Sequence, residues 1–189
     1  MHPLKRFILA LAVTATAASA AAQSTGYEGE MFIKAIRDNN GAEAMKLLKN
    51  ERALLNARNV DGKTALITAI ENRNYDWTAY LLQEGAEPSL AMRNGDTPLI
   101  TAARVGFADA VEWLVGLGAK IDDTNRSGET PLIVAVQRRQ VPIVRTLVAA
   151  GADPDKADSA AGYSARDYAK RDNRTPELLR IIEAKKPAR

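Results

Sequence analysis

The chain has 189 residues, of which 46% are hydrophobic and 26% charged, and its formal net charge at pH 7 is +3. This length and composition fit one folded domain and exclude disorder over the whole chain. The first 22 residues hold Lys5, Arg6 and no acid, so the remainder carries 24 basic and 23 acidic residues, and its net charge of +1 argues against a nucleic-acid partner.

The first 22 residues have the pattern of a secretory signal peptide. A basic pair opens the segment, an apolar Ala-rich run follows over residues 7–18, and small residues close it. Small-x-small triplets predict cleavage after Ala20 or Ala22. The alternative is an N-terminal anchor helix, which is disfavoured because the run is short and weakly apolar for a bilayer. We therefore expect a short linker at residues 23–28, a periplasmic or secreted protein, and no membrane insertion of the mature chain.

The side chains that most enzymes use are missing from the predicted mature chain. The sequence has no cysteine, and its one histidine is His2. Disulfides and thiolate sites are thereby excluded, and the commonest general base and metal ligand are lost. Export without cysteine favours a bacterial periplasm over a eukaryotic extracellular space, where small domains usually carry disulfides. We expect no enzyme, cofactor or metal; a carboxylate-dependent hydrolase remains a remote alternative.

A motif in two parts recurs after the linker with a period of 33 residues. The first part contains a Gly-x-Thr turn before Pro-Leu-Ile or Ala-Leu-Ile, and the second a Leu-Leu or Leu-Val pair before Gly-Ala. The first part occupies residues 61–67, 94–100 and 127–133, and the second residues 80–87, 113–120 and 146–153. Weaker copies of the first part lie at residues 32–35 and 162–165. Such units stack, because each exposes an apolar face that only its neighbours cover.

Each unit predicts two helices. Thr97 and Thr130 are candidate N-caps, and the prolines that follow suit the first helical position, where no amide donor is needed. The Leu-Leu or Leu-Val pairs supply the apolar face of a second helix. Gly85, Gly118 and Gly151 are expected to end that helix, because glycine adopts the left-handed conformation without a steric penalty.

These residues and their spacing resemble the ankyrin repeat. The resemblance implies an all-α solenoid of stacked helix-turn-helix units joined by β-turn fingers. The expected domain covers residues 29–184, and a basic tail follows at 185–189. Its units are an N-terminal cap repeat (29–60), full repeats at 61–93, 94–126 and 127–159, and a C-terminal cap repeat (160–184). Ile67, Ile100 and Ile133 stand where the family often has a histidine, so the hydrogen bonds of that histidine must be lost or replaced by apolar packing.

The resemblance also implies a non-catalytic protein-binding module. With the predicted signal peptide, we expect this module to act outside the cytoplasm, as a monomer. Its partner, one or more proteins, would lie against the fingertips and first helices, the concave face. The candidate contact residues are Lys63, Tyr75, Arg93, Asn94, Asp96, Arg104, Phe107, Arg126, Glu129 and Arg138. The alternative reading of these residues is a solvated surface of mixed charge. An accessory, protective or inhibitory role toward one periplasmic enzyme or toxin also stays open.

Two further groups are assigned structural roles. Trp77, Tyr80 and Trp113 lie on second helices and are expected to pack between units. The carboxylates of residues 153–158 lack the glycine and the closing glutamate of a calcium loop, so we expect no metal there.

Overall fold

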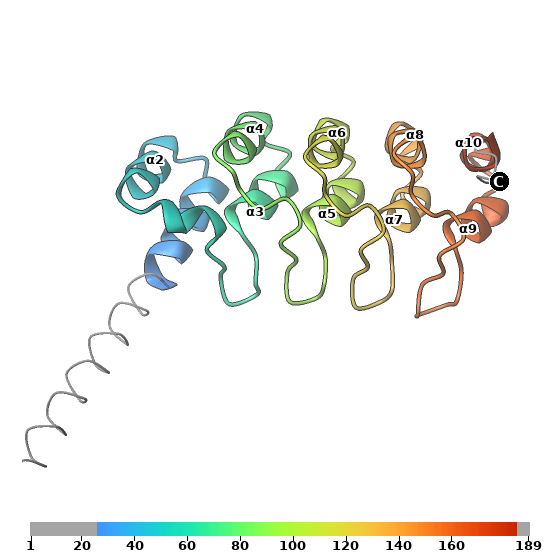
Figure 1. Cartoon of the computed structure of the whole chain (residues 1–189), viewed down its shortest axis with the longest axis horizontal. Coiled ribbons are helices and arrows are strands. Elements are labelled where there is room, and N and C mark those ends of the chain that lie inside the picture. Colours follow the sequence, from blue (N-terminus) through green and yellow to red (C-terminus); the bar gives the residue numbers. More distant parts are fainter. Residues whose placement is uncertain (1–25, 185–189) are drawn as a thin grey trace, which may run out of the picture.

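The computed structural model describes residues 26–184 as one row of helix pairs (Figure 1). The predicted signal peptide, linker residues 23–25 and the tail at 185–189 lie outside the described residues. Over residues 26–184, no helix is long and apolar enough to cross a membrane.

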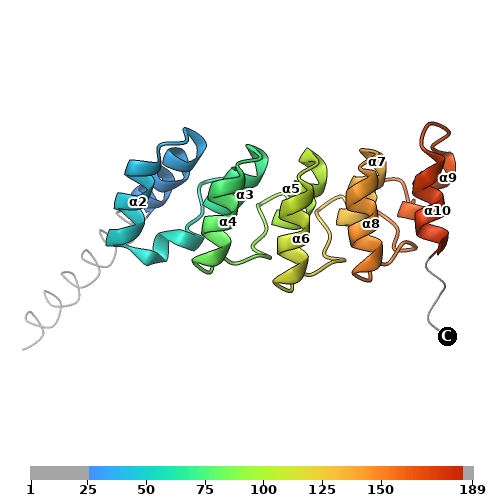
Figure 2. The ribbon, with the colours of Figure 1, turned by 90° about the horizontal axis from the view of Figure 1, so that it is seen from above.

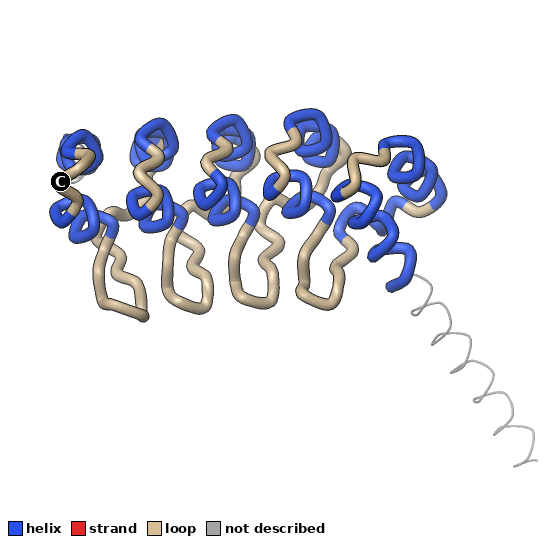
Figure 3. The backbone as a smooth tube through the Cα atoms, turned by 180° about the vertical axis from the view of Figure 1, so that it is seen from behind, coloured by secondary structure: helices blue, strands red, loops and turns tan. Residues whose placement is uncertain are grey.

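The helices form two layers, and hairpin-like fingers project from one side of the stack (Figures 1 and 3). The inner layer contains helical residues 26–37 and then α3 (Ala65–Glu71), α5 (Pro98–Val105), α7 (Pro131–Gln137) and α9 (Ala165–Arg171). The outer layer contains α2 (Gly41–Asn50), α4 (Tyr75–Gln83), α6 (Ala108–Gly116), α8 (Val141–Ala149) and α10 (Pro176–Ala184). A 3-10 helix, η1 (Arg52–Asn56), follows α2. The expected all-α solenoid is therefore confirmed.

The predicted capping residues account for where the helices begin and end. The hydroxyl oxygens of Thr97 and Thr130 accept hydrogen bonds from the amides of Ile100 and Ile133, at 3.2 and 3.1 Å. Gly85, Gly118 and Gly151 have φ values of 92°, 81° and 107° just after the outer helices. Local sequence therefore determines where each inner helix begins and where each outer helix ends, unit by unit.

The core lies between the two layers. Ile67, Ile100 and Ile133 are 0% exposed, so apolar packing takes the place of the histidine common in the family. Leu81, Leu114 and Leu147 are equally buried from the outer helices. Small buried alanines on the inner helices allow neighbouring units to approach closely.

The first and last units differ from the internal ones. η1 stands where the internal units carry Gly-Ala, and it buries Leu54 and Leu55. In the last unit, α10 buries Leu178 and Ile182 and leaves Ile181 half-buried. Apolar residues outside the repeat motif thus complete the core of the first and the last unit.

Candidate protein-binding face

Consecutive fingers are joined to one another through their backbones. The amide of Arg93 donates to the carbonyl of Asp61 at 2.9 Å, and the amide of Arg126 donates to that of Asn94 at 3.0 Å. The last finger repeats this bond from Ser159 to Ser127 at 3.0 Å. Gly95 permits the close approach, because its φ is +84° and a Cβ there would lie 2.9 Å from the amide nitrogen of Arg126. The fingertips thus form a fixed row along the stack.

A polar network connects the bases of the central fingers to the inner helices. Arg104 Nη2 donates to Asp96 Oδ1 at 2.9 Å and lies 3.6 Å from Glu129 Oε2. Asn125 Nδ2 donates to Asp96 Oδ1 at 2.9 Å and to Glu129 Oε2 at 2.8 Å. Asp96 is only 5% exposed, so its carboxylate depends on these donors. One finger earlier, Lys63 Nζ lies 2.6 Å from Glu71 Oε2.

The last finger has a network of its own around the buried Asp158. Its carboxylate accepts from the Tyr168 hydroxyl at 2.6 Å and from the amide of Ala161 at 2.7 Å and of Gly162 at 3.0 Å. Burial by itself would raise the pKa of Asp158, but these hydrogen bonds lower the pKa below its usual value on balance. The bond to Asp158 also raises the pKa of the Tyr168 phenol.

The other carboxylates of residues 153–158 are held internally as well. Asp155 binds the Arg166 guanidinium through both oxygens, at 2.6 and 3.1 Å, and this hydrogen bonding lowers the pKa of Asp155. Asp153 Oδ1 accepts from the amide of Asp155 at 2.9 Å. In the described part of the chain, no group of three or more His, Cys, Asp or Glu side chains is placed to hold a metal ion.

The structure places eight of the ten predicted contact residues in three groups. Arg93, Asn94, Arg126 and Arg138 are exposed on the fingertips and the end of α7. Lys63, Arg104 and Glu129 are half-buried members of the networks at the finger bases. Tyr75 is 54% exposed but lines a groove between the outer helices α4 and α6, so it does not join the arginines on one face.

The prediction that Asp96 and Phe107 contact a partner is wrong, because both side chains are buried. Asp96 is drawn inward by its pairing with Arg104. Phe107 is 4% exposed because it precedes α6 and packs edge-on against Trp113, with ring centroids 6.2 Å apart. Trp77, Tyr80 and Trp113 pack against the hydrophobic core, as expected for aromatics on the second helices.

Two residues of this face were not predicted. Asn125 joins the network of Asp96, and its signal was the asparagine at position 59, two units earlier, although Met92 holds this position in the unit between them. Arg171 stacks on Tyr163, with its guanidinium carbon 4.1 Å from the ring centroid. The last repeat carries only the weaker copy of the motif at residues 162–165, and that copy does not specify this ring contact.

Among the described residues of this face, most carboxylates have side-chain partners, whereas several arginines have none. Glu71, Asp96, Glu129 and Asp158 all accept hydrogen bonds from side chains of the same face. By contrast, the guanidinium groups of Arg93, Arg126 and Arg138 make no hydrogen bond or ion pair within residues 26–184. The face therefore presents free cationic donors, with the fingertip acid Asp61 beside them.

Comparison with known families agrees with the geometry. A family model described as ankyrin repeats in three copies matches residues 81–158, and a model of a single ankyrin repeat matches residues 61–92. Together the two matches span more than half of the chain. No curated protein matches it.

Proposed function

Because this chain belongs to the ankyrin-repeat family, whose repeats are generally protein–protein interaction modules, we propose that it binds a protein through its fingers and inner helices. The observation that carries this proposal is the set of exposed arginines without internal partners, Arg93, Arg126 and Arg138. Arginine offers five donors in a planar fork that matches carboxylates. A partner surface rich in Asp and Glu is therefore favoured.

The fixed spacing of the fingers supports recognition by this face. Arg93 and Arg126 occupy the same place in successive units, and the bonds between finger backbones hold those units in register. Because the finger backbones are already fixed, binding a partner to both arginines costs little conformational entropy in this protein, and the affinity is higher for that reason.

Arg104 has a different role from the one expected. Its guanidinium binds Asp96 and lies beside Glu129, so it shapes the face from within and is not free to anchor a partner.

We further propose that the protein is not an enzyme and that it acts outside the cytoplasm after export. Ankyrin-repeat domains are typically non-catalytic, and the mature chain would contain neither cysteine nor histidine. If affinity capture yields a single exported enzyme as the partner, this result would favour an accessory or inhibitory role toward that enzyme.

The proposal is tested by affinity capture with the processed chain, followed by calorimetry with the partner so identified. Replacing Arg93 and Arg126 by Ala together should weaken binding by about 1–3 kcal/mol per anchor while helical circular dichroism stays unchanged. The matched control replaces Lys120 and Arg180, two exposed cations away from the fingers, and should bind normally. Equal affinity of the double arginine variant and the original chain would overturn the proposed binding face.

A further inference from the structure

Each unit that has a finger carries a corresponding pair of residues, one at the finger base and one eight positions later, near the end of the inner helix. The first two pairs are ion pairs, at 2.6 and 2.9 Å. The last pair is a cation–π contact, with 4.1 Å between the guanidinium carbon and the ring centroid. A tyrosine thus stands in the last unit where a charged residue stands in the others. In chain order the pairs are Lys63 and Glu71, Asp96 and Arg104, Glu129 and Gln137, and Tyr163 and Arg171.

Arg171 is held in place by its partner, but its charge is not neutralised. A guanidinium over the face of Tyr163 is attracted by the ring, and the hydrogen-bond donors around its edge stay available. Within the described residues, Arg171 makes no hydrogen bond or ion pair, and it is exposed. Arg104, at the same position two units earlier, donates to Asp96 instead. The last unit therefore presents an oriented guanidinium with unused donors.

A small cavity opens beside this guanidinium, between α7 and α9, which are neighbours in the inner layer (Figure 2). Its volume is about 240 Å³. The hydroxyl of Tyr168 in its lining donates to Asp158 of the last finger at 2.6 Å, so the cavity adjoins the face that carries the fingers. The lining residues are Val136, Gln137, Arg139, Tyr168, Arg171 and Asp172.

Cations outnumber acids around this cavity. The one acid of its lining, Asp172, already has donors: Arg139 Nε donates to Oδ2 at 2.8 Å, and the amide of Arg174 donates to Oδ1 at 2.9 Å. Three further cations, next in sequence to lining residues, are exposed: Arg138, Lys170 and Arg174. The surroundings of the cavity are therefore strongly positive, although the predicted mature chain has a net charge of only +1.

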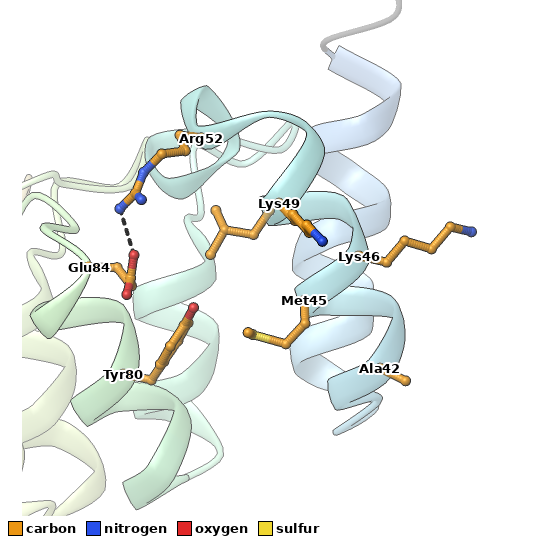
Figure 4. Close-up of a pocket in the computed structure, with 8 residues that line it drawn as sticks. Ala42, Met45, Lys46, Lys49, Arg52, Tyr80 and Glu84 are labelled. Carbon is orange, nitrogen blue, oxygen red and sulfur yellow. Dashed lines mark hydrogen bonds and ion pairs between the residues drawn. The ribbon is translucent and has the colours of Figure 1, made fainter.

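A larger groove in the outer layer lacks such a group. It lies between α2 and α4 and has a volume of about 670 Å³ (Figure 4). The guanidinium of Arg52 at its rim lies 2.6 Å from the carboxylate of Glu84, so its charge is neutralised within the chain. Of these two sites, the cavity between α7 and α9 is the one that offers an unneutralised guanidinium to an anion.

We propose that the cavity between α7 and α9 binds the side-chain carboxylate of a glutamate of the protein partner, with Arg171 as its anchor and Tyr163 as the residue that positions Arg171. This inference rests on the proposed function, because the cavity adjoins the proposed binding face. A planar guanidinium donates two parallel hydrogen bonds to one carboxylate. The apolar surfaces of Val136 and Tyr168 suit the methylene groups of glutamate, of which aspartate has one fewer.

The test is a titration of the processed chain with tetraglutamate, acetylated and amidated at its ends. NMR follows the Nε–Hε resonance of Arg171, and calorimetry gives the dissociation constant. We expect a saturable shift of this resonance and no binding of tetraglutamine capped in the same way. Capped tetraaspartate should bind about fourfold less tightly, because each of its side chains lacks one methylene group. R171Q should raise the dissociation constant of tetraglutamate at least about tenfold.

Two further variants distinguish the planar fork of donors from its charge. R171K keeps the charge without the fork and should raise the dissociation constant at least about threefold. Y163L keeps the guanidinium but removes the ring beneath it, and should raise the constant about two- to fivefold. R180Q is the matched control, because it removes an exposed arginine on α10 outside the cavity, and should leave the constant unchanged. Circular dichroism confirms that each variant is folded.

An Arg171 resonance that does not respond to tetraglutamate overturns the proposal, as does full affinity of R171Q or R171K. Full affinity of Y163L overturns the positioning role of the ring. Equal affinity for inorganic phosphate, or for tetraglutamine with a free C-terminus, overturns the assignment to a glutamate side chain. The titration uses no captured partner, so a negative result leaves the test of Arg93 and Arg126 untouched, and failure of that test leaves the titration untouched.

Discussion

At the scale of single residues, two glycines with similar backbones have different surroundings. Gly95 and Gly85 have φ values of +84° and +92°. A Cβ on Gly95 would lie 2.9 Å from the Arg126 nitrogen in the next finger, whereas a Cβ on Gly85 meets nothing within 4 Å. Alanine substitutions at the two glycines therefore distinguish two losses of folding free energy. One comes from the left-handed backbone alone, and the other from separating two fingers.

We therefore expect G95A to lower the free energy of unfolding more than G85A. The left-handed conformation should cost G85A about 1–2 kcal/mol. G95A should lose that amount and roughly 1 kcal/mol or more besides, because the bond from Arg126 to Asn94 must lengthen. Urea unfolding measures both variants, and equal losses would show that the fingers do not depend on this contact.

The arginines show where sequence-based prediction stops. Arg93 and Arg104 both occupy positions outside the repeat motif, and both were predicted as anchors. In the structure Arg93 is exposed, while Arg104 pairs with Asp96, eight residues before it. The pairing depends on which charge the preceding finger carries at its base. The motif does not specify that charge, since the position is Lys63, Asp96 or Glu129 in successive units.

At the scale of elements, the helices were predictable because their signals are local. Each threonine cap and closing glycine acts within its own unit, so the spacing of 33 residues transfers directly to helix ends. η1 was not predicted, because Leu54 and Leu55 follow no repeated pattern. They are buried where the stack needs apolar cover at its first unit. Phe107 was misjudged for the same reason, since its contact with Trp113 is tertiary.

α6 allows the packing of the stack to be tested with one pair of substitutions. Leu114 is 0% exposed, and Leu117 is 54% exposed. L114D should cost several kcal/mol of unfolding free energy, because it buries a carboxylate without a partner in the middle unit. L117D should change stability by about 0.5 kcal/mol or less in dilute solution.

Thermal unfolding followed by circular dichroism distinguishes these outcomes. Because units contact only their neighbours, L114D should also reduce hydrogen-exchange protection in α4 and α8. A melting temperature unchanged by L114D would contradict the packing described for the middle unit.

At the scale of the whole molecule, the predicted signal peptide determines at which residue the mature protein begins. We expect the exported product to begin at Ala21 or Gln23, and intact-mass analysis reads this directly. A20R should block processing, because Ala20 belongs to the small-x-small triplet of both cleavage sites. A secreted product that retains Met1 would contradict the prediction.

The fingers have a consequence for how such a protein could change its partner. Arg93 stands two residues before Gly95, and Arg126 two residues before Gly128. The glycines determine the backbone, while the side chains of the arginines are exposed and make no contact that the fold requires. In each finger, the glycine thus contributes to stability, and the arginine two residues before it contributes to binding specificity. Substitutions at positions 93 and 126 could retarget the protein with little loss of stability, which leaves its binding preference open to evolution.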